Sequence, residues 1–402
     1  MNISMVLLSL STLISSAGTT LLVSALALSL FDQDASALKA SGVYIAQFLP
    51  AIFLLPLAVR TCNNHEPRKG LILAEVASAI STILLGFFIQ LEWLFMGYCI
   101  LAIRGFLEII TKTFRSVSVK NFAIPSKLEK SNNLVMGGSF LGQALGALAG
   151  FFLVSKISIL HIALIDGLTF LVSALLCSGI VYACVDAKPA ANDFKSSWAG
   201  LLEIRNNPRI RLYFIYLSWV VIIFQSYNQI ARTWIPLAWL DFGLEKGITG
   251  ELIGCGGILV GLLIANSMPA LKINKNILIF LSIFFTCSFL SAPFATKDPA
   301  TSLFFYFVYM VFFEIGFMVS MNSLLVACPK HRVASVMSIF YAFSFGGLTV
   351  SGLLIAYSTD LYRLPVVSLI LALISFLFLL GIHVDSIFSK TKRRTSESGS
   401  RQ

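Results

Sequence analysis

Long apolar stretches alternate with short polar segments along the whole chain. Twelve of these stretches come close to or exceed the roughly 20 mostly apolar residues that a helix needs to cross a bilayer. Because only helices and closed barrels satisfy their backbone hydrogen bonds in lipid, the pattern predicts an all-α integral membrane protein of about 12 transmembrane helices. The stretches are Met5–Phe31, Ser41–Val59, Gly70–Gln90, Trp93–Thr111, Asn132–Val154, Ile159–Val185, Arg211–Trp234, Glu251–Met268, Ile277–Ala295, Ser302–Ala327, Val333–Tyr357 and Leu364–Phe388.

Composition favours a lipid environment over water. Of the 402 residues, 57% are hydrophobic and only 12% are charged, whereas soluble domains are about 25% charged. The formal net charge of +10 would favour nucleic-acid binding in a soluble protein. Here the basic residues lie in short segments between the apolar stretches, so we predict the lipid bilayer as a partner and no nucleic acid.

The distribution of basic residues predicts how the chain is threaded through the membrane. With the N-terminus on the cytoplasmic side, cytoplasmic segments hold 22 of the 29 Lys and Arg residues, and the opposite segments hold 5. The remaining two, Arg104 and Arg232, lie within apolar stretches. Since short cytoplasmic loops carry an excess of Lys and Arg, both termini are predicted to be cytoplasmic.

A polar segment near the middle of the chain divides the spans into two sets of six. We predict six-helix bundles over residues 1–185 and 209–388, a cytoplasmic linker over 186–208, and a basic, disordered tail over 389–402. A weak repeat supports this division, since the pairs Pro125/Pro329, Ser131/Ser335 and Gly142/Gly346 share one offset of about half the chain length.

Ionisable residues inside the spans are the first candidates for function, because charge is costly in hydrocarbon. Arg104 and Glu108 lie near the midplane, four residues apart on one helix face, where they can form either a structural or a functional pair. Glu314 has no partner on its own helix, which favours its protonated form and suits a proton carrier. Asp166 either takes part in transport or bonds a neighbouring helix, and Glu75 can reach the basic loop beside it.

Uncharged polar side chains also gather on one face of several spans. They occur in the first, seventh and tenth spans, and the fourth holds the midplane arginine. Polar faces on lipid-borne helices are expected to line a cavity, or alternatively to hydrogen-bond neighbouring helices. The first span carries Ser9, Thr12, Ser16, Thr19 and Thr20, and the other two carry Ser218, Gln225, Gln229, Arg232 and Asn322.

The fifth span has glycines at Gly138, Gly142, Gly146 and Gly150, a strict four-residue spacing. This spacing places all four on one helix face, where the absence of side chains allows another helix to approach closely. The pattern predicts helix packing and carries no information about a substrate.

The remaining reactive side chains do not form a recognisable catalytic or metal site. The seven Cys and four His residues are scattered, without the spacing of a zinc site or a disulfide framework. No phosphate-binding loop or metalloprotease motif occurs either. We therefore expect no metal, no cofactor and no enzymatic activity, and keep a membrane enzyme or non-transporting sensor as the alternative of another class.

Several segments together resemble the major facilitator superfamily, and more narrowly its drug and siderophore exporters, such as macrolide-efflux and enterobactin-export proteins. The segments are ISSAGTTLLVSALALSLF in the first span, FLPAIFLLPLA followed by RK, the arginine of the fourth span, the IP…SNN entry to the fifth, and DGLTFLVSALL in the sixth. The resemblance implies two six-helix bundles that rock about a midplane site, and it assigns Arg104 to proton coupling. It also assigns Asn63, Arg68 and Lys69 to a gating loop.

These expectations combine into one functional prediction. The protein is expected to be a monomeric, multi-pass transporter of the bacterial inner (plasma) membrane, which exports a small organic molecule, a siderophore or drug, with protons as the coupling ion. An uptake permease of the same fold is the alternative. The charge of the substrate stays open, because Arg104 and Arg232 favour an anion whereas Glu108 and Glu314 favour a cation.

Overall fold

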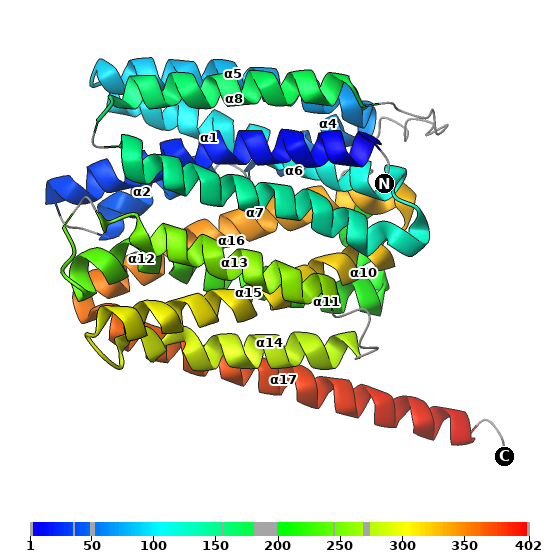
Figure 1. The fold of residues 1–402 in the computed structure, drawn as a ribbon. Helices are drawn as coiled ribbons and strands as arrows, with labels where there is room; N and C mark the ends of the chain where they lie inside the picture. The colour runs from blue at the N-terminus through cyan, green and yellow to red at the C-terminus, as the bar shows by residue number, and fades with distance from the viewer. Residues whose placement is uncertain are drawn as a thin grey trace.

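The computed structural model describes residues 3–34, 37–48, 53–154, 156–180, 199–243, 246–267 and 274–399. Every regular element in these ranges is a helix, and the long helices run roughly side by side (Figure 1). The start of α1 and the end of α17 lie at the same end of the molecule, which we call the terminal end (Figure 1).

The helices fall into two groups along the chain. The N-terminal helices are α1 (Ile3–Asp34), α2 (Ala37–Phe48), α4 (Leu55–Asn64), α5 (Pro67–Gln90), α6 (Leu94–Phe122), α7 (Leu128–Leu153) and α8 (Ile159–Ser178). The C-terminal helices are α11 (Pro208–Trp219), the π-helix η2 (Val220–Gln225), α12 (Ser226–Trp234), the π-helix η3 (Ile235–Trp239), α13 (Thr249–Ser267), α14 (Lys275–Leu290), α15 (Pro299–Ala327), α16 (Val333–Tyr362) and α17 (Leu364–Gly399). Short elements connect them: η1 (Pro125–Lys127), α10 (Ala199–Asn206), η6 (Ala292–Phe294) and η7 (Lys330–Arg332).

The all-helical, membrane-spanning prediction is confirmed. Ten of the described helical segments are long and apolar enough to cross a membrane, and they coincide with ten of the predicted stretches. The stretch at Trp93–Thr111 became part of α6 (Leu94–Phe122), which is not among these ten segments. The stretch at Ser41–Val59 is divided between α2 and α4, with residues 49–52 outside the described part of the chain. The total of 12 spans and the cytoplasmic termini stay predictions.

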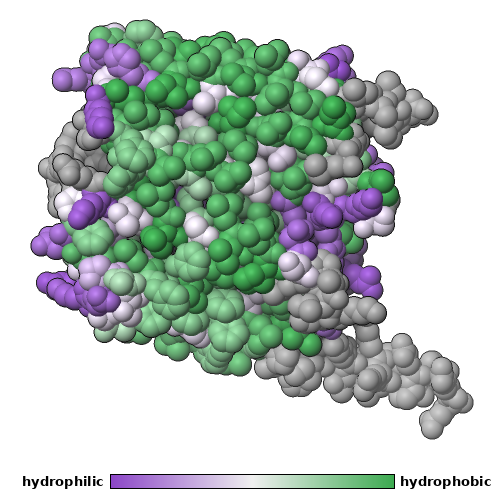
Figure 2. All heavy atoms as spheres, viewed as in Figure 1, coloured by the Kyte–Doolittle hydropathy of each residue, from purple (hydrophilic) through white to green (hydrophobic). Residues whose placement is uncertain are grey.

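The surface in Figure 2 has the distribution expected of a protein that spans a bilayer. Hydrophobic residues cover the broad lateral face, and hydrophilic residues gather at the two ends (Figure 2). Large apolar side chains are exposed on the surface of the molecule, for example Phe95 (77% exposed) and Leu175 (72% exposed). A soluble monomer rarely exposes so much contiguous apolar area. The chain is therefore a multi-pass integral membrane protein.

The predicted linker and the predicted tail are only partly described by the structure. The predicted linker 186–208 lies mostly outside the described residues, and its last part forms α10. Helix α17 continues to Gly399, and the predicted disorder of the tail stays a prediction. The tail contains Lys, Arg and Glu, which have good helix propensity, and no Gly or Pro interrupts it before Gly399.

Local sequence fixes where two of the site-bearing helices begin. Pro208 and Pro299 occupy the first turn of α11 and α15, where a missing N–H costs nothing. The preceding Asn207 and Asp298 cap these helices, and the Asp298 carboxylate accepts hydrogen bonds from the hydroxyl (2.6 Å) and the backbone N–H (2.9 Å) of Thr301. These bonds to the Thr301 hydroxyl and backbone lower the pKa of Asp298.

Close packing inside the N-terminal group depends on the glycine face of α7. A Cβ atom built on Gly142 would lie 2.1 Å from the backbone oxygen of Leu13, and one on Gly146 would lie 2.2 Å from that of Ala17. Gly138 meets Ser9 in the same way, at 2.5 Å. These three glycines therefore lie directly against α1. Gly150 is the exception, since its nearest neighbours are the ends of the Ile248 and Leu21 side chains.

The two groups of helices meet along a broad interface. In Figure 1 the N-terminal helices occupy the upper part and the C-terminal helices the lower part. Contacts across the boundary run mainly from α2, α4 and α6 to α16, and from α7 to α13.

Candidate functional site

A cavity of about 290 Å³ lies between the N-terminal and C-terminal helices. Its wall is formed by α1, α2, α6 and α7 on one side and by η2, α12, α13, α15 and α16 on the other, with single residues from α5 and α8. The structure brings six of the candidate residues to this wall, whereas Asp166 and Asn322 lie outside it. The six are Arg104, Glu108, Gln225, Gln229, Arg232 and Glu314.

The predicted pairing of Arg104 with Glu108 on one helix is wrong. Arg104 Nη2 lies 2.9 Å from Asp166 Oδ2 on α8, and both side chains are buried. Arg104 also donates a long hydrogen bond of 3.5 Å to the Thr19 hydroxyl and lies over the Phe170 ring. The fully desolvated carboxylate of Asp166 attracts the guanidinium more strongly than the partly exposed Glu108 does. Asp166, which does not line the cavity itself, therefore fixes the position of the Arg104 guanidinium.

Glu108 is engaged elsewhere in the wall. Its Oε1 lies 2.7 Å from Lys112 Nζ, one turn further along α6, and its Oε2 accepts a 2.8 Å hydrogen bond from Gln47 Nε2. Lys112 Nζ in turn lies 4.6 Å from the centre of the Phe345 ring on α16. This group joins α2, α6 and α16 across the boundary between the two sets of helices.

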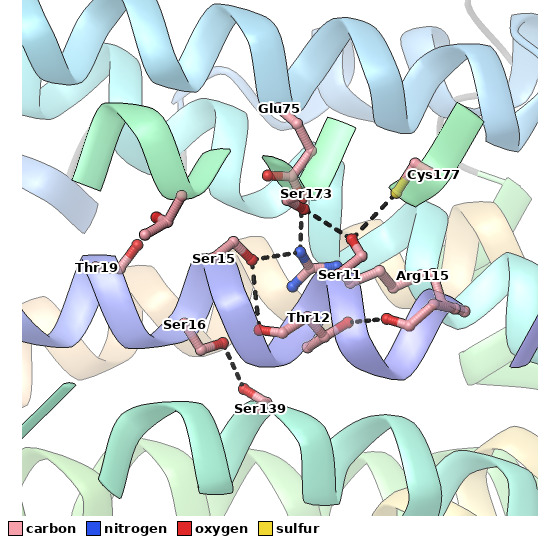
Figure 3. Close-up of polar contacts among 12 residues, drawn as sticks. Ser11, Thr12, Ser15, Ser16, Thr19, Glu75, Arg115, Ser139, Ser173 and Cys177 are labelled. Atoms are coloured by element: carbon pink, nitrogen blue, oxygen red, sulfur yellow. Dashed lines mark hydrogen bonds and ion pairs between the residues drawn. The ribbon is translucent and has the colours of Figure 1, made fainter. Parts of the chain in front are cut away.

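Arg115 belongs to the site but was assigned to a cytoplasmic loop in the sequence analysis. It pairs with the fully buried Glu75 at 2.6 Å and donates a 2.8 Å hydrogen bond to the Ser15 hydroxyl (Figure 3). The sequence allowed Glu75 to contact the basic loop beside its helix, but in the structure it pairs with Arg115 instead. Arg115 follows Arg104 by three helical turns on the same face, a spacing that would have revealed it. The early predicted end of the fourth span at Thr111 concealed this, because α6 continues to Phe122.

The polar side chains of α1 serve both of the uses considered from sequence. Ser11, which does not line the cavity, contacts Ser173 (2.7 Å) and Cys177 (3.1 Å) on α8 (Figure 3). Ser16 contacts Ser139 of α7 at 3.0 Å. Ser16, Thr19 and other hydroxyl groups of the same helix also line the cavity. The face therefore combines helix packing with a polar wall.

The stripe predicted on the seventh span is interrupted by a π-helix. Gln225 and Gln229 line the cavity, but Ser218 does not. The π-helix η2 lies between Ser218 and Gln229, and its i→i+5 hydrogen bonds put more residues in each turn, which changes the angular phase between the residues before and after it. Arg232, at the end of α12, forms a 2.6 Å ion pair with Glu251 of α13.

Glu314 differs from every other charged group of the wall. It is completely buried in α15, and neither of its carboxylate oxygens has a hydrogen-bond partner among the described residues. Its Cβ and Cγ pack against Gly261 of α13, where a Cβ atom would lie 2.8 Å from the Glu314 Cβ. Glu314 was predicted to have no partner on its own helix, and the described parts of the neighbouring helices supply no hydrogen-bond partner either.

Asn322 was predicted to line the cavity, and this placement is wrong. It lies near the terminal end in a chain of asparagine side chains that joins α7 to α15 and α13. Asn132 Nδ2 donates to Asn322 Oδ1 at 2.8 Å, and Asn322 Nδ2 donates to Asn133 Oδ1 at 2.7 Å. Asn133 continues the chain to Asn266 at 3.2 Å. Complementary amide partners hold Asn322 at the boundary of the two helix groups instead of in the cavity.

Other polar contacts cross the same boundary at the terminal end. The Lys120 ammonium donates to the backbone carbonyl of Leu325 at the end of α15. The Ser116 hydroxyl lies 3.1 Å from that of Tyr341. Of the predicted gating residues, Asn63 crosses the boundary and donates to the Ser335 hydroxyl at 3.2 Å.

The two basic gating candidates remain within the N-terminal helices. Arg68 donates to the carbonyl of Ser178 at the end of α8. Lys69 lies 3.5 Å from Glu66, in an exposed pair of the kind that contributes little stability. Only Asn63 of these three therefore contacts the opposite group of helices among the described residues.

Replacing Asn322 by alanine is expected to loosen the terminal end. The change removes two buried hydrogen bonds of about 1 kcal/mol each, which alters the ratio of closed to open forms by roughly tenfold or more. Spin labels at Ile124 and Lys330, on opposite sides of the boundary, would then show an added longer distance by pulsed electron paramagnetic resonance.

Ser323→Ala is the matched control for Asn322→Ala, because among the described residues the Ser323 hydroxyl donates only to the Val319 carbonyl of its own helix. An unchanged distance distribution in Asn322→Ala would show that the asparagine chain does not hold this end closed.

Comparisons with known proteins bear on this arrangement. The sequence profile described as "Major Facilitator Superfamily" matches residues 8–348. No curated protein matches the chain by sequence. Among solved structures, the human organic anion transporter TETRAN is similar at 13% identity, with a TM-score of 0.75 over 94% of this chain and 99% of that one.

Two further solved structures share the fold. The E. coli fucose:proton symporter FucP is similar at 14% identity, with a TM-score of 0.69 over 94% of this chain and 97% of that one. A bacterial homologue of the iron transporter ferroportin, in an outward-facing state, is similar at 16% identity, with a TM-score of 0.65 over 95% of this chain and 99% of that one. At these identities the likeness concerns the fold alone.

Proposed function

The chain belongs to the Major Facilitator Superfamily, and from this premise we propose that it is a proton-coupled exporter of a small organic molecule in a bacterial inner membrane. Transport proceeds by alternating access, as the N-terminal and C-terminal helices rock about the cavity between them. The observation that carries the proposal is Glu314, a buried carboxyl group on the wall of this cavity that has no hydrogen-bond partner among the described residues. Burying such a group inside a membrane protein costs free energy, so its presence there indicates a function.

The contacts at the terminal end favour an alternating mechanism. The asparagine chain and the Lys120 bond to α15 join the two groups of helices, and the partly exposed ion pair between Lys275 and Glu129 also crosses the boundary. The neutral asparagine bonds contribute about 1 kcal/mol each and the charge-assisted Lys120 bond about 1.5–3 kcal/mol, whereas a partly exposed ion pair contributes about 1 kcal/mol or less. Contacts of this size are within reach of a modest change in the cavity. Binding and release of a proton at Glu314 is a change of this kind, because it creates or removes a charge beside the boundary.

The direction of transport rests on the sequence resemblance to macrolide and siderophore exporters. Inside-out vesicles that accumulate protons provide the test, with acridine orange as the reporter of the gradient. We expect erythromycin or enterobactin to release part of the gradient when wild-type protein is present, since an exported solute would exchange for lumenal protons. Glu314→Gln is expected to abolish this release.

Glu92→Gln is the matched control, because Glu92 is exposed in the turn between α5 and α6 and lies outside the cavity. If Glu314→Gln releases the gradient as the wild type does, proton exchange at Glu314 is excluded.

Uptake with a proton is the second candidate, favoured by the fold similarity to the fucose:proton symporter. In this case, adding a transported sugar to intact, lightly buffered cells would make the medium more alkaline. Alkalinisation with a sugar, together with no response to exported compounds in inside-out vesicles, would reverse the proposed direction and leave the cavity and its carboxylate in place.

A further inference from the structure

The charges around the cavity are nearly all neutralised within the protein. Four cationic side chains reach the wall, and the structure gives each of them a carboxylate partner. Two of those partners lie behind the wall, on α5 and α8, and the other two lie in it. The pairs are Arg104–Asp166, Lys112–Glu108, Arg115–Glu75 and Arg232–Glu251.

This pairing weakens the case for an anionic substrate. Arg104 and Arg232 were the residues that favoured an anion, and each already lies within 2.9 Å of a carboxylate oxygen. Each guanidinium has further N–H donors, and Arg104 Nη1 has no hydrogen-bond partner among the described residues. An anion bound at either one would, however, lie close to the carboxylate already paired with it, and the two negative charges would repel each other.

One ionisable group remains when the four pairs are set aside, and it is a carboxyl group. Glu314 is the fifth acidic group of the set, and among the described residues neither of its oxygens has a hydrogen-bond partner. The cavity therefore presents a single ionisable group without a counter-charge, and a cation beside it would favour its ionised form. Its position on α15 is fixed by packing against Gly261.

Aromatic rings line the same cavity as this carboxyl group. Phe313 and Phe317 lie one residue before and three residues after Glu314 on α15, with ring centres 6.3 Å apart. Phe140 of α7 packs edge-on against Phe317, with centres 6.4 Å apart, and all three rings line the cavity. Aromatic faces attract cations, and more strongly when water is excluded. A carboxylate beside such rings suits a positive charge that carries apolar groups.

We propose that the cavity binds a lipophilic organic cation, with its positive centre at Glu314 and its apolar groups on Phe140, Phe313 and Phe317. This inference rests on the proposed transport function and names the class of substrate for the same cavity. The proposed cation differs in charge from the organic anion in the name of TETRAN. At 13% identity the similarity concerns the fold, and the residues of the cavity wall are free to differ.

Two ions of nearly equal size and opposite charge provide the test. Purified protein is titrated calorimetrically with tetraphenylphosphonium and, separately, with tetraphenylborate. We expect the cation to bind wild-type protein at least tenfold more tightly than the anion does. Glu314→Gln should weaken binding of the cation at least tenfold, whereas Glu92→Gln should leave it unchanged. Circular dichroism and gel filtration confirm that each variant is folded.

Three outcomes would overturn the inference: tighter binding of tetraphenylborate, equal binding of tetraphenylphosphonium by Glu314→Gln and wild type, or no binding of the cation at all. The vesicle assay separates this failure from that of the transport proposal. Proton exchange with a neutral or anionic compound, without cation binding, would refute only the cation. Glu314-dependent cation binding by a protein that moves no protons would refute only proton-coupled transport.

Discussion

Replacing Arg104 by glutamine is expected to lower the stability of the protein by about 3–5 kcal/mol, the range found when one partner of a buried ion pair is removed. Asp166 explains the size of the effect, because it is 0% exposed and does not line the cavity. Its carboxylate would be left without a counter-charge and without access to water. Asp166→Asn is expected to cost less, since Arg104 lines the cavity and can be hydrated there.

The double variant Arg104→Gln with Asp166→Asn separates stability from transport. It has no unpaired charge, so its midpoint of thermal unfolding in detergent should return most of the way to that of the wild type. Transport should remain lost if Arg104 acts in proton coupling, as the family resemblance implies. Equal unfolding midpoints for Arg104→Gln and the wild type would mean that the pair does not hold α6 to α8.

Replacing Arg115 by glutamine is the second change with a large expected effect. Glu75 is completely buried on α5, and Arg115 is its ion-pair partner at 2.6 Å. The same guanidinium donates a hydrogen bond to the Ser15 hydroxyl of α1 (Figure 3). The substitution therefore removes a contact that joins α1, α5 and α6. We expect a loss of about 3–5 kcal/mol, again because a buried carboxylate is left unpaired.

A double-mutant cycle with Glu75→Gln measures this interaction directly. Residues in contact typically show coupling energies of roughly 0.5–3 kcal/mol, and a buried ion pair is expected at the upper end of that range. Thermal unfolding of the two single variants and the double variant provides the measurement. Strictly additive effects would show that the Arg115–Glu75 contact is not formed in the folded protein.

The sequence predicted the helical spans well because a span is a local property. Length and hydropathy within one segment decide whether it can cross a bilayer, and ten predicted stretches coincide with spans of the structure. The errors occurred where charges enter a helix, as at the end of α6. There the apolar pattern stopped at Thr111, but the helix continued to Phe122 with Arg115 inside the protein.

The sequence also predicted several of the residues that line the cavity, but the same criterion selected one residue that does not line it. Arg104, Glu108, Gln225, Gln229, Arg232 and Glu314 were found from the cost of polarity within apolar spans, and all six line the wall. Asn322 met the same criterion but lies in the asparagine chain, because polarity alone does not distinguish a wall from a contact between helices.

By itself, then, the sequence determined that this protein is a bundle of membrane-spanning helices with a few deep ionisable groups. Hydrophobic length and periodicity are carried by neighbouring residues, so no knowledge of the fold was needed. The tertiary structure alone decided which charges neutralise each other. Arg104 pairs with Asp166 on α8 instead of Glu108 on its own helix, and Glu314 has no hydrogen-bond partner in the part of the chain that the structure describes. Pairing depends on distances between residues far apart in the chain and on their burial, and neither is encoded in local pattern.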